Sequence, residues 1–194
     1  MIGDDAVMLT TEARARIAES YLHHIIIALE AEDRAAPFRD FLDNWFAYET
    51  VRGHLTTGGR PIWFNNPCAK RHKAALAAMH FVSRNAAAIL ADASSAGSQY
   101  AKMRLGKGPS IRLMVDHAIP LRVLRQTMFE DSRLKSIDAL RAFLRQNYRL
   151  GVVTFEENAR LSSLVLVSAM PGDWSGADPF ARYAAAGIER VASI

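Results

Sequence analysis

Residues 10–33 read TTEARARIAESYLHHIIIALEAED, and this stretch decides the fold class. Its larger apolar side chains recur every four residues and therefore align on one face of a helix: Ile17, Tyr21, Ile25 and Leu29. Thr10 or Thr11 can cap the start of that helix, because a hydroxyl oxygen accepts hydrogen bonds from the free amides of the first turn. The stretch predicts a long amphipathic helix that ends near Asp33.

Two further helices are predicted in the first half of the chain. Pro37 suits the first position of one, since its ring presets the helical φ angle and its missing N–H is not needed there. Asn66-Pro67 repeats this cap-and-proline start and opens a third helix, predicted to reach about Asp92. Residues 93–110 are rich in Ser, Gly and Pro and mark a candidate subdomain boundary.

The second half mixes helices with short strands. The predicted strands are 111–115 and 151–153, and the predicted helices are 120–129, 137–148, 154–165 and 178–188. Thr154 and Glu157 have the spacing of a capping box, in which each side chain accepts from the other residue's backbone amide. The sequence thus predicts one mainly α-helical domain over 1–194. At most two or three short strands are expected, all in the C-terminal half, and the three N-terminal helices are expected to pack against that half.

The composition is that of a globular cytoplasmic protein. Apolar residues make up 50% and charged residues 23% of the 194 positions, enough for a core without disulfides or zinc. Cys68 is the one cysteine, so no intramolecular disulfide can form. The first five residues contain Asp4 and Asp5 where a signal peptide carries basic residues. We therefore expect a cytoplasmic protein with no membrane contact.

Positive charge is concentrated in the middle of the chain. Residues 1–66 hold six basic and ten acidic residues, whereas residues 102–149 hold eleven basic and four acidic ones. A regional excess of this kind favours an anionic partner, either nucleic acid or an acidic protein. Four of these cations surround a Gly-Pro loop that lets backbone approach a phosphate, and they are the predicted nucleic-acid contacts: Lys102, Arg104, Lys107 and Arg112. The alternative is a set of solvated helix faces.

Asp116-His117, at the end of the first predicted strand, is the most specific candidate for a catalytic and metal-binding site. A neutral imidazole can take a proton from water, because its ordinary pKa lies near physiological pH. A neighbouring carboxylate can hold a divalent cation that neutralises a scissile phosphate. His117 would then be the general base and a metal ligand, and Asp116 a metal ligand or the group that orients His117.

The stretch Val115-Asp116-His117-Ala118-Ile119-Pro120 resembles the opening of the HNH, or ββα-metal, endonuclease motif. In that family the His ends the first strand, an Asn lies near the start of the following helix, and a further His or Asn completes the site. The resemblance implies a catalytic role for Asn158 and a divalent metal cofactor, Mg²⁺ or Mn²⁺. The chain departs from the family because no His follows Asn158 and about thirty residues separate the two strands.

Two functional hypotheses follow. The first is an HNH-like, metal-dependent endonuclease that acts on DNA through Asp116, His117 and Asn158. The second is a non-catalytic helical module that binds nucleic acid or an acidic protein through the basic region 102–149. In the second case Asp116 is expected to cap the helix that opens near Pro120, and His117 to bond nearby backbone.

Overall fold

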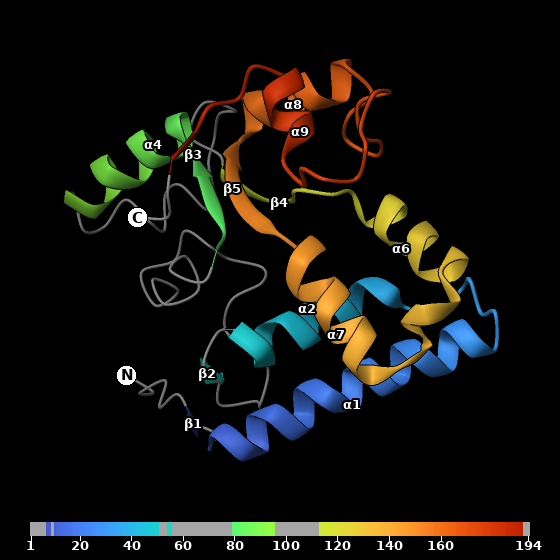
Figure 1. Cartoon of the computed structure of the whole chain (residues 1–194). Coiled ribbons are helices and arrows are strands. Elements are labelled where there is room, and N and C mark those ends of the chain that lie inside the picture. Colours follow the sequence, from blue (N-terminus) through green and yellow to red (C-terminus); the bar gives the residue numbers. More distant parts are fainter. Residues whose placement is uncertain (1–6, 9, 51–53, 56–78, 96–112, 192–194) are drawn as a thin grey trace. The chain divides into compact units, whose positions relative to one another are not determined.

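The structure is a computed structural model that describes residues 7–8, 10–50, 54–55, 79–95 and 113–191 (Figure 1). Helices account for 60% of the described residues, so the prediction of a mainly α-helical protein is confirmed. The chain divides into two compact units, 1–64 with 125–144 and 65–124 with 145–194. Most of the predicted boundary at 93–110 lies outside the described residues, and the single-domain organisation stays a prediction. Among the described helices, none has both the length and the apolar composition that crossing a membrane requires.

The first unit is built around an antiparallel pair of helices, α1 (Thr11–Glu30) and α2 (Phe38–Thr50). The Thr10 hydroxyl accepts from the amide of Ala13, as expected of an N-cap. The 3-10 helix η3 (Ser132–Lys135), part of α6 (Leu121–Glu130) and part of α7 (Ile137–Asn147) complete this unit. A two-stranded ribbon joins β1 (Val7–Met8) to β2 (His54–Leu55). The buried side chains of α1 and α2 form most of its core: Ala18, Leu22, Ile25, Ile26, Leu29, Phe38, Leu42, Trp45 and Phe46.

The second unit contains a four-stranded sheet in the order β4-β5-β3-β6. The strands are β3 (Phe81–Ser83), β4 (Leu113–His117), β5 (Leu150–Thr154) and β6 (Arg190–Val191). The two central strands, β3 and β5, run parallel, and each edge strand pairs antiparallel with its neighbour. Helices α4 (Arg84–Ser95), α8 (Phe155–Ser163) and α9 (Ala181–Ala185) belong to the same unit. This unit contains Asp116, His117 and Asn158.

A close approach between the central strands depends on Gly151. It lies opposite Phe81 in the parallel register, and Phe81 is 2% exposed. A Cβ atom added to Gly151 would lie 2.1 Å from the Phe81 ring, well inside van der Waals contact. The ring thus occupies the space that any side chain at position 151 would need.

Glu157 connects the starts of two helices that follow the parallel strands. The predicted capping box is confirmed, because Thr154 Oγ1 accepts from the Glu157 amide at 3.2 Å and Glu157 Oε2 accepts from the Thr154 amide at 2.8 Å. The same carboxylate accepts from Ser83 Oγ at 2.5 Å and from Asn85 Nδ2 at 3.0 Å. Ser83 in turn accepts from the Ala86 amide and so caps α4. A carboxylate that is 2% exposed therefore satisfies donors at the N-terminal ends of α4 and α8.

The prediction of one helix from Asn66 to Asp92 is wrong. Residues 66–78 lie outside the described residues, and the remainder is strand β3 followed by α4. All three β3 residues are buried, with Phe81 and Val82 suited to a strand by aromatic and β-branched side chains. Ser83 ends the strand and caps the next helix. Burial in a sheet interior outweighed a helical spacing of apolar residues.

The other predicted elements are present, with shifted ends. The strand predicted over 111–115 is β4, which extends to His117, and the strand predicted over 151–153 is β5. The helix predicted over 178–188 is reduced to α9. Strands β1, β2, β3 and β6 were not predicted. The described residues contain six strands, more than the two or three expected, and β1, β2 and β3 lie in the N-terminal half, where none was expected.

Candidate functional site

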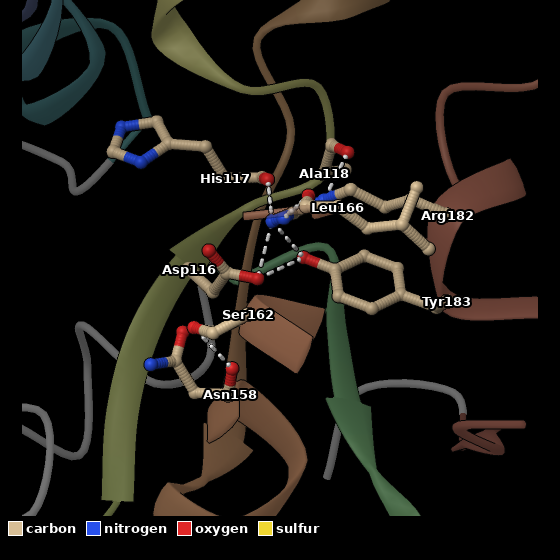
Figure 2. Close-up of polar contacts among 8 residues, drawn as sticks. All are labelled: Asp116, His117, Ala118, Asn158, Ser162, Leu166, Arg182 and Tyr183. Atoms are coloured by element: carbon tan, nitrogen blue, oxygen red, sulfur yellow. Dashed lines mark hydrogen bonds and ion pairs between the residues drawn. The ribbon is translucent and has the colours of Figure 1, made fainter. Parts of the chain in front are cut away.

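Asp116 lies on β4 and takes part in a cluster with two residues of α9 (Figure 2). Its Oδ2 atom accepts hydrogen bonds from the Tyr183 hydroxyl at 2.7 Å and from Arg182 Nη2. The Asp116 side chain is 14% exposed, whereas Arg182 and Tyr183 are fully buried. The carboxylate is therefore held by a cation and a phenol of its own chain, and Asp116 does not cap the helix after Pro120.

Arg182 uses all three of its guanidinium nitrogens. Nε donates to the Ala118 carbonyl at 2.9 Å, and Nη1 donates to the Leu166 carbonyl at 2.7 Å. Nη2 donates to Asp116, to the His117 carbonyl and to the Tyr183 hydroxyl. One side chain thus ties the end of β4 to the segment after α8. Such a fully partnered buried cation is a structural crosslink.

Tyr183 is a hydrogen-bond donor at any physiological pH. Burial, followed by the negative charge of Asp116, raises the pKa of Tyr183 well above its ordinary value. The phenol therefore stays protonated and donates a hydrogen bond to the Asp116 carboxylate. This arrangement strengthens the hold on the carboxylate.

His117 lies on the other side of the strand from the Asp116 carboxylate (Figure 2). This follows from strand geometry, since successive side chains point to opposite faces. His117 is 7% exposed, and its Nε2 forms a 3.1 Å hydrogen bond with the hydroxyl of Tyr148, which is 1% exposed. The two rings meet edge to face, with centroids 5.3 Å apart. The imidazole is therefore packed and hydrogen-bonded to the Tyr148 side chain.

Asn158 is in the first part of α8, as predicted, and is half-buried. Its backbone carbonyl accepts from Ser162 Oγ at 3.0 Å. Within the described ranges it shares no hydrogen bond with Asp116 or His117. The structure therefore groups Asp116 with Arg182 and Tyr183, and groups His117 with Tyr148.

The fit of these residues to a divalent metal is poor as they are arranged. One oxygen of Asp116 already accepts from a cation and a phenol, and the imidazole of His117 lies on the opposite face. The part of the chain that the structure describes contains no group of three or more His, Cys, Asp or Glu side chains that could hold a metal ion. Mg²⁺ or Mn²⁺ as a cofactor stays a prediction that depends on the endonuclease hypothesis.

We expect His117→Ala to lower the free energy of unfolding by about 1–3 kcal/mol, since the buried Tyr148 hydroxyl loses its partner. The matched control His23→Ala, on the exposed side of α1, should change it by less than about 0.5 kcal/mol. Denaturant unfolding measures both. Equal, small effects would contradict the structural role. So would a rise in melting temperature with Mg²⁺ or Mn²⁺ that disappears in His117→Ala, because only a native metal site gains stability from the ion.

The residues that hold Asp116 and His117 were not predicted from the sequence. Arg182, Tyr183 and Tyr148 lie far from the Asp-His pair in sequence, and no local motif marks them. One available signal was an arginine inside an otherwise apolar segment, ARYAAAGI from Ala181 to Ile188. Such a cation is buried only when carbonyls and carboxylates surround it.

A cleft of about 510 Å³ lies elsewhere in the second unit, lined by His80, Phe81, Ala184, Ile188, Glu189, Arg190 and Val191. Burial, together with the nearby charge of Arg149, lowers the pKa of His80 to about 4, so its imidazole is neutral at physiological pH. Its Nδ1 accepts from the Leu150 amide at 3.1 Å. None of Asp116, His117 and Asn158 lines this cleft.

The predicted nucleic-acid contacts Lys102, Arg104, Lys107 and Arg112 lie outside the described residues, so their roles stay predictions. The rest of the basic region is described over 113–149. Comparison of the whole chain with protein-family models, with curated proteins and with solved structures found no match. The arrangement of these side chains and the distribution of charge are therefore the basis for any functional conclusion.

Proposed function

We propose that this protein is a non-catalytic binding module that engages nucleic acid through the basic region 102–149. The observation that carries the proposal is the state of His117, which is 7% exposed and hydrogen-bonded to a buried tyrosine. A general base needs an accessible nitrogen beside its metal ligand. Here the imidazole and the Asp116 carboxylate lie on opposite faces of one strand. Both candidate catalytic groups contribute to the folded core.

The charge of the basic region supports a polyanionic ligand. Eleven basic and four acidic residues over 102–149 leave a large local excess of positive charge in a protein whose net charge is +4. Phosphate contacts of this kind supply most of the affinity of sequence-independent nucleic-acid binding. The HNH-like endonuclease remains the alternative, and it would require Asp116 to be released from Arg182 and Tyr183.

The salt dependence of DNA binding tests the proposal. We expect the logarithm of the affinity of the full chain for a mixed-sequence DNA duplex to fall linearly with the logarithm of salt concentration between about 50 and 200 mM. Lys107→Ala with Arg112→Ala should reduce the slope by about one unit per lost phosphate contact. The control Arg16→Ala removes an exposed cation from the acidic first third and should leave the slope unchanged.

Two outcomes would contradict the proposal. Absence of binding at about 50 mM salt would exclude nucleic acid and leave an acidic protein as the ligand of the basic region. Cleavage of the duplex in Mg²⁺ or Mn²⁺ that His117→Ala abolishes would establish the endonuclease instead.

A further inference from the structure

Helix α6 carries two exposed arginines that no acidic side chain of the described ranges pairs with, Arg122 and Arg125. Two other cations of the basic region are paired with carboxylates. Arg133 holds Asp131 through two nitrogens at 2.8 and 2.7 Å, and Arg141 reaches Glu19 at 2.8 Å. The unpaired charge of α6 is therefore available to a ligand.

The two arginines share one side of the helix. They are three residues apart, a spacing that leaves about 5–6 Å between Cβ atoms on a helix surface. Leu124 and Met128 are buried on a neighbouring side of α6. The first turn contains no acidic residue, so the positive end of the helix dipole adds to both charges. We call Arg122 and Arg125 the α6 basic face.

We propose that the α6 basic face contacts the phosphate backbone of double-stranded DNA without reading its sequence. This inference rests on the proposed function and names the ligand and the contact. Glu130 places negative charge at the far end of the same helix, which restricts phosphates to the N-terminal half. Two cations held at a fixed spacing by a rigid helix suit the fixed phosphates of a stiff duplex.

The side chains around the α6 basic face argue against base recognition. Gln126 is exposed next to both arginines, and an amide can read adenine. Its Nε2 already donates to Glu130 Oε1 at 2.9 Å. The aromatic side chain on this side of α6, Phe129, is half-buried: it packs edge to face against Phe38, and the Arg34 guanidinium lies over its ring. Binding of single strands depends on stacking bases against exposed aromatic rings, and this ring is already engaged. A backbone contact with a duplex is the interaction that these groups can make.

The test compares fluorescence anisotropy titrations of a mixed-sequence duplex, a second duplex of different sequence and one separated strand. Arg122→Ala and Arg125→Ala should each lower the salt slope for both duplexes by about one unit and weaken affinity about threefold to tenfold at low salt. The control Arg16→Ala removes one exposed cation from α1, outside the basic region, and should leave the slope unchanged. Circular dichroism of each variant checks that the fold is kept, as expected for exposed side chains.

The outcomes separate this inference from the proposed function. Unchanged salt slopes in Arg122→Ala and Arg125→Ala, with duplex binding kept, would overturn the α6 basic face while leaving nucleic-acid binding intact. Tighter binding of the single strand, or a large preference for one duplex sequence, would overturn the sequence-independent duplex contact. No binding of any of the three probes would overturn the proposed function itself. Tight, sequence-independent duplex binding that depends on both arginines would support the inference.

Discussion

Replacing Arg182 with methionine is expected to lower the free energy of unfolding by about 3–5 kcal/mol, because it leaves several carbonyls without their donor and a largely buried carboxylate without its cation. Arg182 is fully buried and reaches Asp116, the carbonyls of Ala118 and Leu166, and Tyr183. Methionine keeps the length and apolar stem of the side chain but donates no hydrogen bond. Urea denaturation with circular dichroism measures the loss.

Two companion variants identify its cause. Arg190→Met removes an exposed arginine whose guanidinium lies 4.1 Å from the centre of the Phe180 ring, and it should cost less than about 1 kcal/mol. Adding Asp116→Asn to Arg182→Met should recover part of the loss, since the uncompensated buried charge is then absent. Equal stabilities of Arg182→Met and Arg190→Met would show that the buried crosslink does not stabilise the fold.

Gly151→Ala is expected to destabilise the second unit by about 3 kcal/mol, through overpacking of the sheet interior. The added methyl group would meet the Phe81 ring at 2.1 Å, and Phe81 is 2% exposed. Its neighbours include Phe180 and Tyr183, with ring centroids 5.5 and 4.7 Å away. Thermal and urea unfolding should both report the effect.

Gly172→Ala is the matched control, because nothing lies within 4 Å of a Cβ atom at that position. It should change stability by no more than about 0.5 kcal/mol. In a Phe81→Leu background the additional cost of Gly151→Ala should shrink, since the two positions share one space. Strict additivity of these two substitutions would contradict the clash.

Local signals were enough to predict most of the helices. The four-residue spacing from Ile17 to Leu29 gave α1, and the Thr154–Glu157 capping box placed the start of α8 at the right residue. These features act over one or two helical turns and need no knowledge of distant neighbours. The same is true of β4 and β5, whose apolar runs are bounded by breakers.

The wrong prediction at β3 and the unpredicted partners of Asp116 and His117 have a common physical cause. Phe81-Val82-Ser83 is too short for its pattern to distinguish strand from helix, and its assignment depends on pairing with β5 and β6. Asp116 and His117 were correctly placed at the end of a strand, but their partners come from α9 and from Tyr148. Neighbours that are distant in sequence decide whether such a pair is free for chemistry or committed to the core. One sequence does not reveal them.

The order of strands in the sheet has a consequence for how this unit folds. The central strand β3 pairs on one side through Val82 and Val152 and on the other through Val82 and Val191, so both of its partners follow it in the chain. Until β5 and β6 have been synthesised, a strand made of Phe81 and Val82 has two open edges and no cover. Pairings of such high contact order slow folding and leave strand edges exposed to aggregation meanwhile. Assembly of this sheet therefore waits until Val191 has left the ribosome.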